Sequence, residues 1–101
     1  MSSHAPASST TTEQDPRYRV TRWEFDPGTA TGMHRHEFDY VVIPITGGPF
    51  TVVGDDGSEM QMEQVAGQTY ARKAGVVHDV RYAGDDRAVF VEVEFLTDDA
   101  T

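Results

Sequence analysis

The chain has 101 residues, the length of a single domain with one modest core. Its 17 acidic and 8 basic residues give a net charge of −9 without any basic stripe, which argues against binding to nucleic acid or to anionic membranes. Because cysteine is absent, neither a disulfide framework nor a protein thiolate can contribute.

Residues 1–16 are small and polar, with almost no large apolar side chain. Such a segment cannot bury enough surface to offset the entropy lost on ordering, so we expect a flexible N-terminal tail. It lacks the basic start and apolar stretch of a secretory signal, and no part of the chain reaches transmembrane length. These features favour a cytoplasmic protein.

Residues 17–97 alternate short runs rich in Val, Ile, Thr, Tyr and Phe with turns that contain Gly and Pro, and no long run has helical periodicity. This pattern predicts an all-β sandwich or barrel, followed by a C-terminal tail at 98–101. Asp56-Gly57 is a strong hairpin signal, and residues 88–96 alternate as a half-buried strand should. The eight expected strands span residues 18–25, 32–36, 38–46, 50–54, 59–65, 68–72, 77–82 and 88–96.

Three histidines lie within two separate frames of glycines. His34 and His36 share one face of an extended strand, because side chains alternate with a period of two. A histidine in a strand is more often a surface or hydrogen-bonded residue than a ligand, so this pair alone is weak evidence. His78, in an independent glycine frame, strengthens it, and the three together predict a transition-metal site. His4 lies in the expected tail.

The two frames resemble the motifs of the cupin superfamily, G-x5-H-x-H-x3-E-x6-G and G-x5-P-x-G-x2-H-x3-N. Tyr40 stands where cupins usually have a glutamate ligand, Lys73 where they have proline and Tyr82 where they have asparagine. The runs WEFDPGTATGMHRHEFDYVVIPITGG and AGVVHDV are similar to the small one-domain cupins known as beta-alanine degradation proteins. The resemblance covers roughly residues 17–96 and implies a single-domain jelly-roll barrel, the double-stranded β-helix. Besides the three histidines, the positions in register are Gly28, Gly47, Gly67 and Gly75.

The sequence leaves the identity of the fourth metal ligand open, because Tyr40 stands where the motif has a glutamate. Strand parity would turn Phe38 and Tyr40 inward and Glu37 and Asp39 outward, unless a bulge after His36 brings one of the two carboxylates to the metal. A phenol ligates only when deprotonated, so we favour a three-histidine site with Tyr40 as an outer donor or substrate contact. The alternative for Tyr40 is an ordinary barrel-filling aromatic.

Other residues are candidates for the pocket. Tyr82 should share a strand face with His78, so Tyr40 and Tyr82 are the candidate catalytic residues. Tyr70 and Arg72 share a face and are candidate substrate-binding residues, with Arg72 able to hold a substrate carboxylate in bidentate fashion if that face is inward. An exposed arginine is the alternative.

The predicted ligand set bears on function. Three neutral histidines leave the charge of a divalent ion uncompensated, which favours a small anionic, chelating substrate. The set resembles that of the cupin thiol dioxygenases and a diketone-cleaving dioxygenase, which implies Fe(II), although Ni, Zn, Cu or Mn can occupy such a site. We therefore predict a dioxygenase-like enzyme. The alternative is a non-catalytic barrel that binds a metal or small ligand as an accessory or sensor in a catabolic pathway.

A short chain with eight strands should expose sheet edges and apolar outer faces. Many cupins pair as two-fold dimers, and a homodimer would cover such a surface. The residues expected to face outward are Val41, Ile43, Ile45, Phe90 and Leu96.

Overall fold

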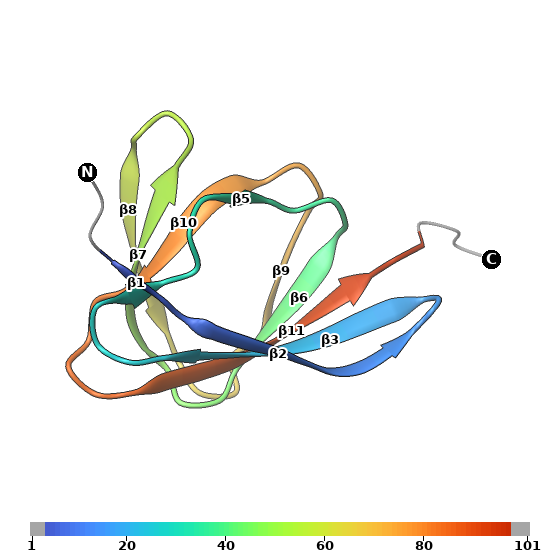
Figure 1. The fold of residues 1–101 in the computed structure, drawn as a ribbon, viewed down its shortest axis with the longest axis horizontal. Coiled ribbons are helices and arrows are strands. Elements are labelled where there is room, and N and C mark those ends of the chain that lie inside the picture. The colour runs from blue at the N-terminus through green and yellow to red at the C-terminus, as the bar shows by residue number, and fades with distance from the viewer. Residues whose placement is uncertain (1–3, 98–101) are drawn as a thin grey trace.

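Two β-sheets face each other in the computed structural model, which describes residues 4–97 (Figure 1). One sheet has the strand order β1-β4-β10-β7-β8 with β5 paired to β10, and the other has the order β2-β3-β11-β6-β9. The chain crosses between the two sheets several times, and the all-β, single-domain prediction is confirmed. The strands are β1 (Ala5–Pro6), β2 (Ser8–Asp15), β3 (Tyr18–Phe25), β4 (Thr29–Ala30), β5 (His34–Arg35), β6 (Tyr40–Pro44), β7 (Gly48–Gly54), β8 (Glu59–Gln64), β9 (Tyr70–Arg72), β10 (Val77–Tyr82) and β11 (Ala88–Phe95).

All eight expected strands are present, and β3 and β10 have the predicted bounds. The largest difference lies between residues 32 and 40, where only His34–Arg35 is a strand and β6 starts at Tyr40. His36 lies in the intervening loop, which is bonded to the turn before β10: its N–H donates to the Val76 carbonyl at 2.8 Å, and its carbonyl accepts from Gly75 N–H at 2.8 Å. These two backbone hydrogen bonds, and not a continuous strand ladder, fix the conformation of this segment.

The N-terminal segment is ordered in strands, so the expected flexible tail is wrong for residues 5–15. β1 pairs in parallel with β4, and β2 pairs antiparallel with β3 from Ser8↔Glu24 to Asp15↔Tyr18. Nearly all of β2 is exposed, which shows that the backbone ladder along the edge of β3 holds it in place, and not burial. Residues 1–3 and the expected tail at 98–101 lie outside the described residues.

The core is built around aromatic rings. Phe25 and Phe50 are fully buried, with ring centroids 5.2 Å apart at 82°, an edge-to-face contact. Phe90 packs against both rings and is 4% exposed, so its predicted outward orientation is wrong. The inner face of β11 carries Phe90 together with Glu92 and Glu94, because side chains two residues apart point to the same side of a strand.

Glycines with positive φ form several turns. Gly57 (φ 84°) lies in the tight turn between β7 and β8, and the predicted Asp56-Gly57 hairpin is confirmed. Gly47 (φ 82°) has a further constraint, since a Cβ there would come within 2.8 Å of the Gln64 carbonyl oxygen. Only glycine combines that backbone angle with so close an approach.

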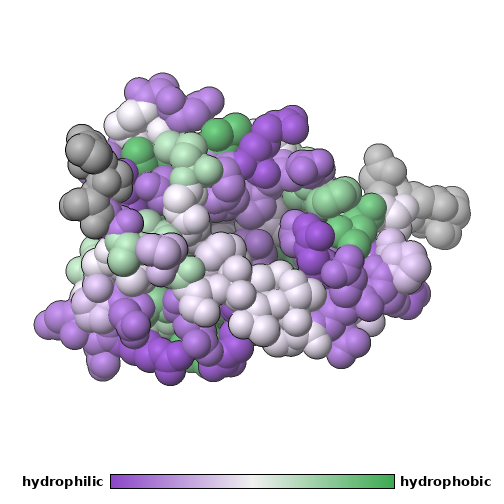
Figure 2. All heavy atoms as spheres, viewed as in Figure 1, coloured by the Kyte–Doolittle hydropathy of each residue, from purple (hydrophilic) through white to green (hydrophobic). Residues whose placement is uncertain are grey.

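The face of the molecule in Figure 2 is mostly hydrophilic, with smaller hydrophobic areas near the ends of β6 and β11. Within residues 4–97, no helix has the length and apolar character needed to cross a membrane.

Candidate metal centre

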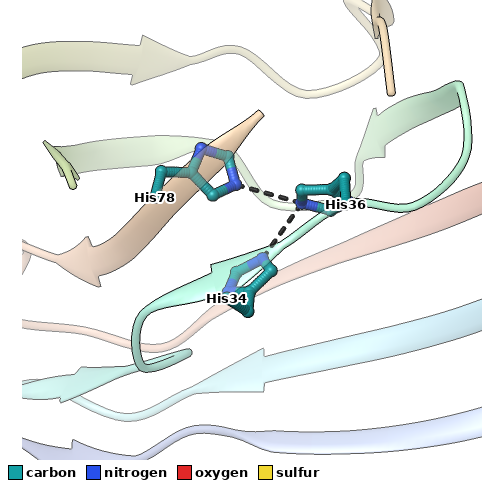
Figure 3. A group of neighbouring side chains, drawn as sticks. All are labelled: His34, His36 and His78. Atoms are coloured by element: carbon teal, nitrogen blue, oxygen red, sulfur yellow. Dashed lines mark hydrogen bonds between the residues drawn. The ribbon is translucent and has the colours of Figure 1, made fainter. Parts of the chain in front are cut away.

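Three imidazole rings converge between the sheets (Figure 3). The Nε2 atom of His36 lies 3.0 Å from Nε2 of His34 and 3.0 Å from Nε2 of His78. His34 and His78 are direct cross-strand partners in β5 and β10, so their side chains point to the same side of the sheet. His36 reaches the same point from the loop, and residues far apart in the sequence thereby form one cluster.

The segment that carries His34 is fixed to β10 at Thr31 and Gly32. Thr31 N–H donates to the Val80 carbonyl at 2.9 Å, and Val80 N–H donates to Thr31 Oγ1 at 3.0 Å. Gly32 N–H donates to Asp79 Oδ1 at 3.0 Å, and Arg81 pairs with the other oxygen of Asp79. The loop around His34 is therefore held to the strand that carries His78.

The three rings present nitrogens that can bind a metal. Nδ1 of His34 lies 2.8 Å from the Gly32 carbonyl, so Nδ1 carries the proton and leaves the Nε2 lone pair free. Burial, and then the neighbouring His34, lower the pKa of His36 and of His78 to about 4. Both rings are then neutral at physiological pH, the form that binds a metal.

The spacing of the nitrogens fits a metal better than it fits a set of hydrogen bonds. A single proton on His36 Nε2 can serve only one of its two neighbours at 3.0 Å. By contrast, two nitrogens about 2.1 Å from one ion and at right angles to each other lie about 3.0 Å apart. The ligating atoms of His34, His36 and His78 all lie within 4.8 Å of one another, so the cluster can hold a divalent ion.

Tyr40 is packed against the cluster. Its ring stacks on the ring of His36, with centroids 3.8 Å apart and planes 13° from parallel, and it is 2% exposed. Burial raises the pKa of Tyr40, with a smaller contribution from Glu92, so the phenol stays protonated and is a poor ligand. Tyr40 supports a histidine from the corner where cupins usually have a glutamate.

The two carboxylates considered next to His36 lie elsewhere. Glu37 and Asp39 are exposed, and Asp39 accepts a hydrogen bond from Ala74 N–H at 2.8 Å while Lys73 lies 3.9 Å away. Both line a separate hollow with Phe95, and Glu37 also lines the hollow that contains His36 and Glu92. Neither carboxylate belongs to the three-histidine cluster.

Sequence reasoning missed a carboxylate at this site, Glu92. Ligating atoms of His36, Glu92 and Glu94 lie within 4.8 Å of one another. Burial, and then the charge of Glu94, raise the pKa of Glu92 to about 7, while Trp23 and Arg19 lower it by smaller amounts. The sequence does contain a signal for this residue. Two glutamates at alternate positions of an otherwise apolar strand must share a face.

A cavity of about 320 Å³ adjoins the cluster, with His34, His78, Tyr40 and Glu92 in its wall. Most of its other lining is apolar and merges with the core; these residues include Val42, Val52, Met60, Met62, Val77, Val80 and Phe90. The site therefore combines a polar ligand cluster with an apolar chamber, the usual composition of a small-molecule pocket.

Tyr70 and Arg72 also line this cavity. The Tyr70 hydroxyl accepts a hydrogen bond from Gln64 Nε2 at 2.9 Å, and burial raises the pKa of Tyr70. The guanidinium of Arg72 lies 4.6 Å from the centroid of the Tyr70 ring, and the residue is exposed. The cavity thus has one cationic side chain in its wall.

Tyr82 lies outside the site, so the expectation that it forms a pocket wall does not hold. It is 6% exposed and packs in the core with Phe25 and Phe50. Although Tyr82 shares a strand face with His78, four residues of strand separate them by about 13 Å. The ring faces Gly48 and Gly84 instead, where a Cβ would contact it.

Comparison with known proteins gives consistent relatives, although no family model matches the chain. The beta-alanine degradation protein BauB of Pseudomonas aeruginosa is 49% identical over 75 residues, which cover 74% of this chain and 78% of that protein. The crystal structure of a cupin domain from Bordetella pertussis Tohama I superposes with a TM-score of 0.87 at 39% identity, covering 91% of this chain and 95% of that one. A double-stranded β-helix protein from Klebsiella pneumoniae has a TM-score of 0.76 at 21% identity, covering 95% and 82% of the two chains, and shares the fold.

Proposed function

The chain belongs to the cupin superfamily and has its jelly-roll fold, and on that premise we propose that it is a metal-dependent enzyme with dioxygenase-type chemistry on a small anionic organic substrate. One observation carries the proposal. Three imidazoles direct their Nε2 atoms at a common point beside a cavity of about 320 Å³. A centre held by three side chains has positions left for a substrate and for oxygen.

The roles of the residues follow from their positions. His34, His36 and His78 would hold the ion, and Tyr40 would keep the His36 ring in place by stacking. Fe(II), when bound, would bring a chelating anion and molecular oxygen together and supply electrons to the reaction. The apolar walls around it exclude water and strengthen electrostatic contacts with a charged substrate.

Two features support a substrate with an anionic end and a carbon body. Arg72 offers a guanidinium in the cavity wall, where it can bind a carboxylate. The remaining lining is largely apolar, which favours carbon chains over compact zwitterions. The relative's name, a beta-alanine degradation protein, supports small organic acids from amino-acid breakdown as the substrate class.

Oxygen uptake tests the proposal. Protein reconstituted with Fe(II) under anaerobic conditions would be mixed with a panel of short 3-oxo acids, 1,3-dicarbonyl compounds and thiol carboxylates, and oxygen consumption followed on exposure to air. We expect at least one compound to be consumed in proportion to oxygen. The matched controls are the Zn(II)-loaded protein and the His78→Ala variant, both of which should be inactive.

Binding without turnover would favour the alternative function, a non-catalytic barrel. If panel compounds bind to the Fe(II) protein without any oxygen uptake, the chain is a non-catalytic metal- and ligand-binding barrel. Binding is measured separately by calorimetry, so the two outcomes are distinguishable.

A further inference from the structure

Glu92 faces the metal centre from a strand outside both histidine motifs. It lies in the middle of β11, directly opposite Val42 of β6 on one side and Thr21 of β3 on the other. Val42 is a core residue with 3% exposure, and opposite residues in an antiparallel pair share a face, so Glu92 points inward. It lines the cavity together with His34 and His78, and it also lines the neighbouring hollow with His36.

The neighbouring Glu94 has a partner that Glu92 lacks. Arg19 binds both oxygens of Glu94, through Nε at 2.8 Å and Nη2 at 3.0 Å. Among residues 4–97, no ion pair involves Glu92. The side chain that approaches it from β3, Trp23, has an N–H donor and no charge. From β6 the aromatic ring of Tyr40 and the apolar Val42 face it.

A carboxylate without an ion-pair partner is costly at such a place, because the imidazoles and apolar side chains around it cannot balance its charge and Arg72, which lines the same cavity, forms no ion pair with it. A divalent ion held by the imidazoles would balance it. Position 40, where the superfamily motif has a glutamate, here carries an aromatic ring stacked on His36. The cavity beside His34 and His78 therefore has one acidic side chain in its wall, and that side chain comes from β11.

We propose that Glu92 supplies the anionic ligand of this metal centre, in place of the residue at position 40. The inference rests on the three-histidine metal site of the proposed function. Coordination by Glu92 would lower the net charge of a divalent centre from +2 to +1, so a singly charged substrate would leave the loaded site neutral. It also predicts that the substrate approaches past the Tyr70 and Arg72 side of the cavity, away from β11.

Binding of Co(II) alone tests this, because its visible spectrum reports the ligand set. The affinity of Co(II) would be measured by competition with a chelator for the unsubstituted protein, Glu92→Gln and Glu94→Gln. Glu94→Gln is the matched control: the same change, two residues along the same face, at a carboxylate bound to Arg19. Circular dichroism of each apo protein checks that it is folded.

We expect Glu92→Gln to weaken Co(II) binding more than about 100-fold, beyond the 10–100-fold loss typical of an outer partner, and to change the spectrum. Glu94→Gln should weaken it less than about 10-fold and leave the spectrum unchanged. Unchanged affinity in Glu92→Gln would overturn the proposal, and so would weaker binding with an unchanged spectrum. If the unsubstituted protein binds no Co(II), the metal centre itself is wrong, which is a separate result.

Discussion

At the scale of single residues, Tyr40 has a role set by stacking and not by its hydroxyl group. The ring lies 3.8 Å from that of His36, and burial keeps the phenol protonated. We therefore expect Tyr40→Phe to bind metal with the same stoichiometry and within about 10-fold of the original affinity, whereas Tyr40→Ala should lose about 10–100-fold because His36 is no longer held. Chelator competition measures both. Loss of the metal in Tyr40→Phe would mean that the phenol is a ligand.

Buried titratable groups predict how the stability of the metal-free protein depends on pH. An unfolded histidine takes up a proton below its ordinary pKa of 6.5, but folded His36 and His78 do so only near 4, so their contribution is lost as pH falls through this range. Glu92 acts in the opposite direction, because its folded pKa of about 7 exceeds the ordinary 4.5. The two histidines outweigh the one glutamate, so the free energy of unfolding should fall as the pH is lowered from 6.5 to 5.

Urea unfolding with a chelator present measures this slope. We expect the free energy of unfolding to fall by about 1 kcal/mol per pH unit over that range, and by about 2 kcal/mol per unit in Glu92→Gln, where the opposing group is absent. A slope of the opposite sign would show that the rings of His36 and His78 are protonated in the fold.

The residues of the site could be predicted to different degrees from the sequence. The three histidines were found because their spacing within glycine frames is local and specific. Glu92 was missed because β11 alternates valines with glutamates, and apolar character alone places the valines inside. In the structure Phe90, Glu92 and Glu94 occupy the inner face, and Phe90 and Glu92 line the cavity.

At the scale of elements, the connection between β6 and β7 depends on Gly47. A Cβ there would lie 2.8 Å from the Gln64 carbonyl, and φ is 82°. Gly67 has nearly the same angle, φ 81°, with nothing within 4 Å of its Cβ position, and provides the control. We expect Gly67→Ala to destabilise the fold by about 1 kcal/mol, from backbone strain alone, and Gly47→Ala by at least about 2 kcal/mol, as measured by urea unfolding. Equal losses would show that the close approach is relieved without cost.

Strand positions were predictable where a run rich in β-branched and aromatic residues ends at a turn, as in β3 and β10. β2 was not, because its sequence SSTTTEQD has no apolar face and its order comes from backbone bonds to β3. The predicted length of β5 was too great for a related reason. The loop that follows it is fixed by contacts with Val76 and Gly75, which are distant in sequence.

At the scale of the whole molecule, the outer face of the β3-β11-β6 sheet carries an apolar strip. Val93 lies between Val20 and Val41, and Val91 lies beside Ile43, all of them half-buried. Alternation places these side chains opposite the core-facing Phe90 and Val42. Such a strip of adjacent apolar side chains is typical of a surface that meets a partner, and we expect a homodimer across it.

Light scattering at micromolar concentration measures the mass. We expect about 22 kDa, twice the 11.2 kDa of one chain, with and without metal. Ile43→Glu should shift the protein toward the single-chain mass, because it buries a charge at the centre of the strip, whereas Thr51→Glu, on the other sheet, should not. A single-chain mass in the unsubstituted protein would rule the homodimer out.

The metal content of the protein tests the central claim most directly. Protein purified without an affinity tag and reconstituted with Fe(II) should hold about one divalent ion per chain by elemental analysis. His78→Ala should lose most of it, since the three imidazoles act as one unit, and His4→Ala should keep it. Absence of metal in the reconstituted protein, or full occupancy in His78→Ala, would contradict the three-histidine centre.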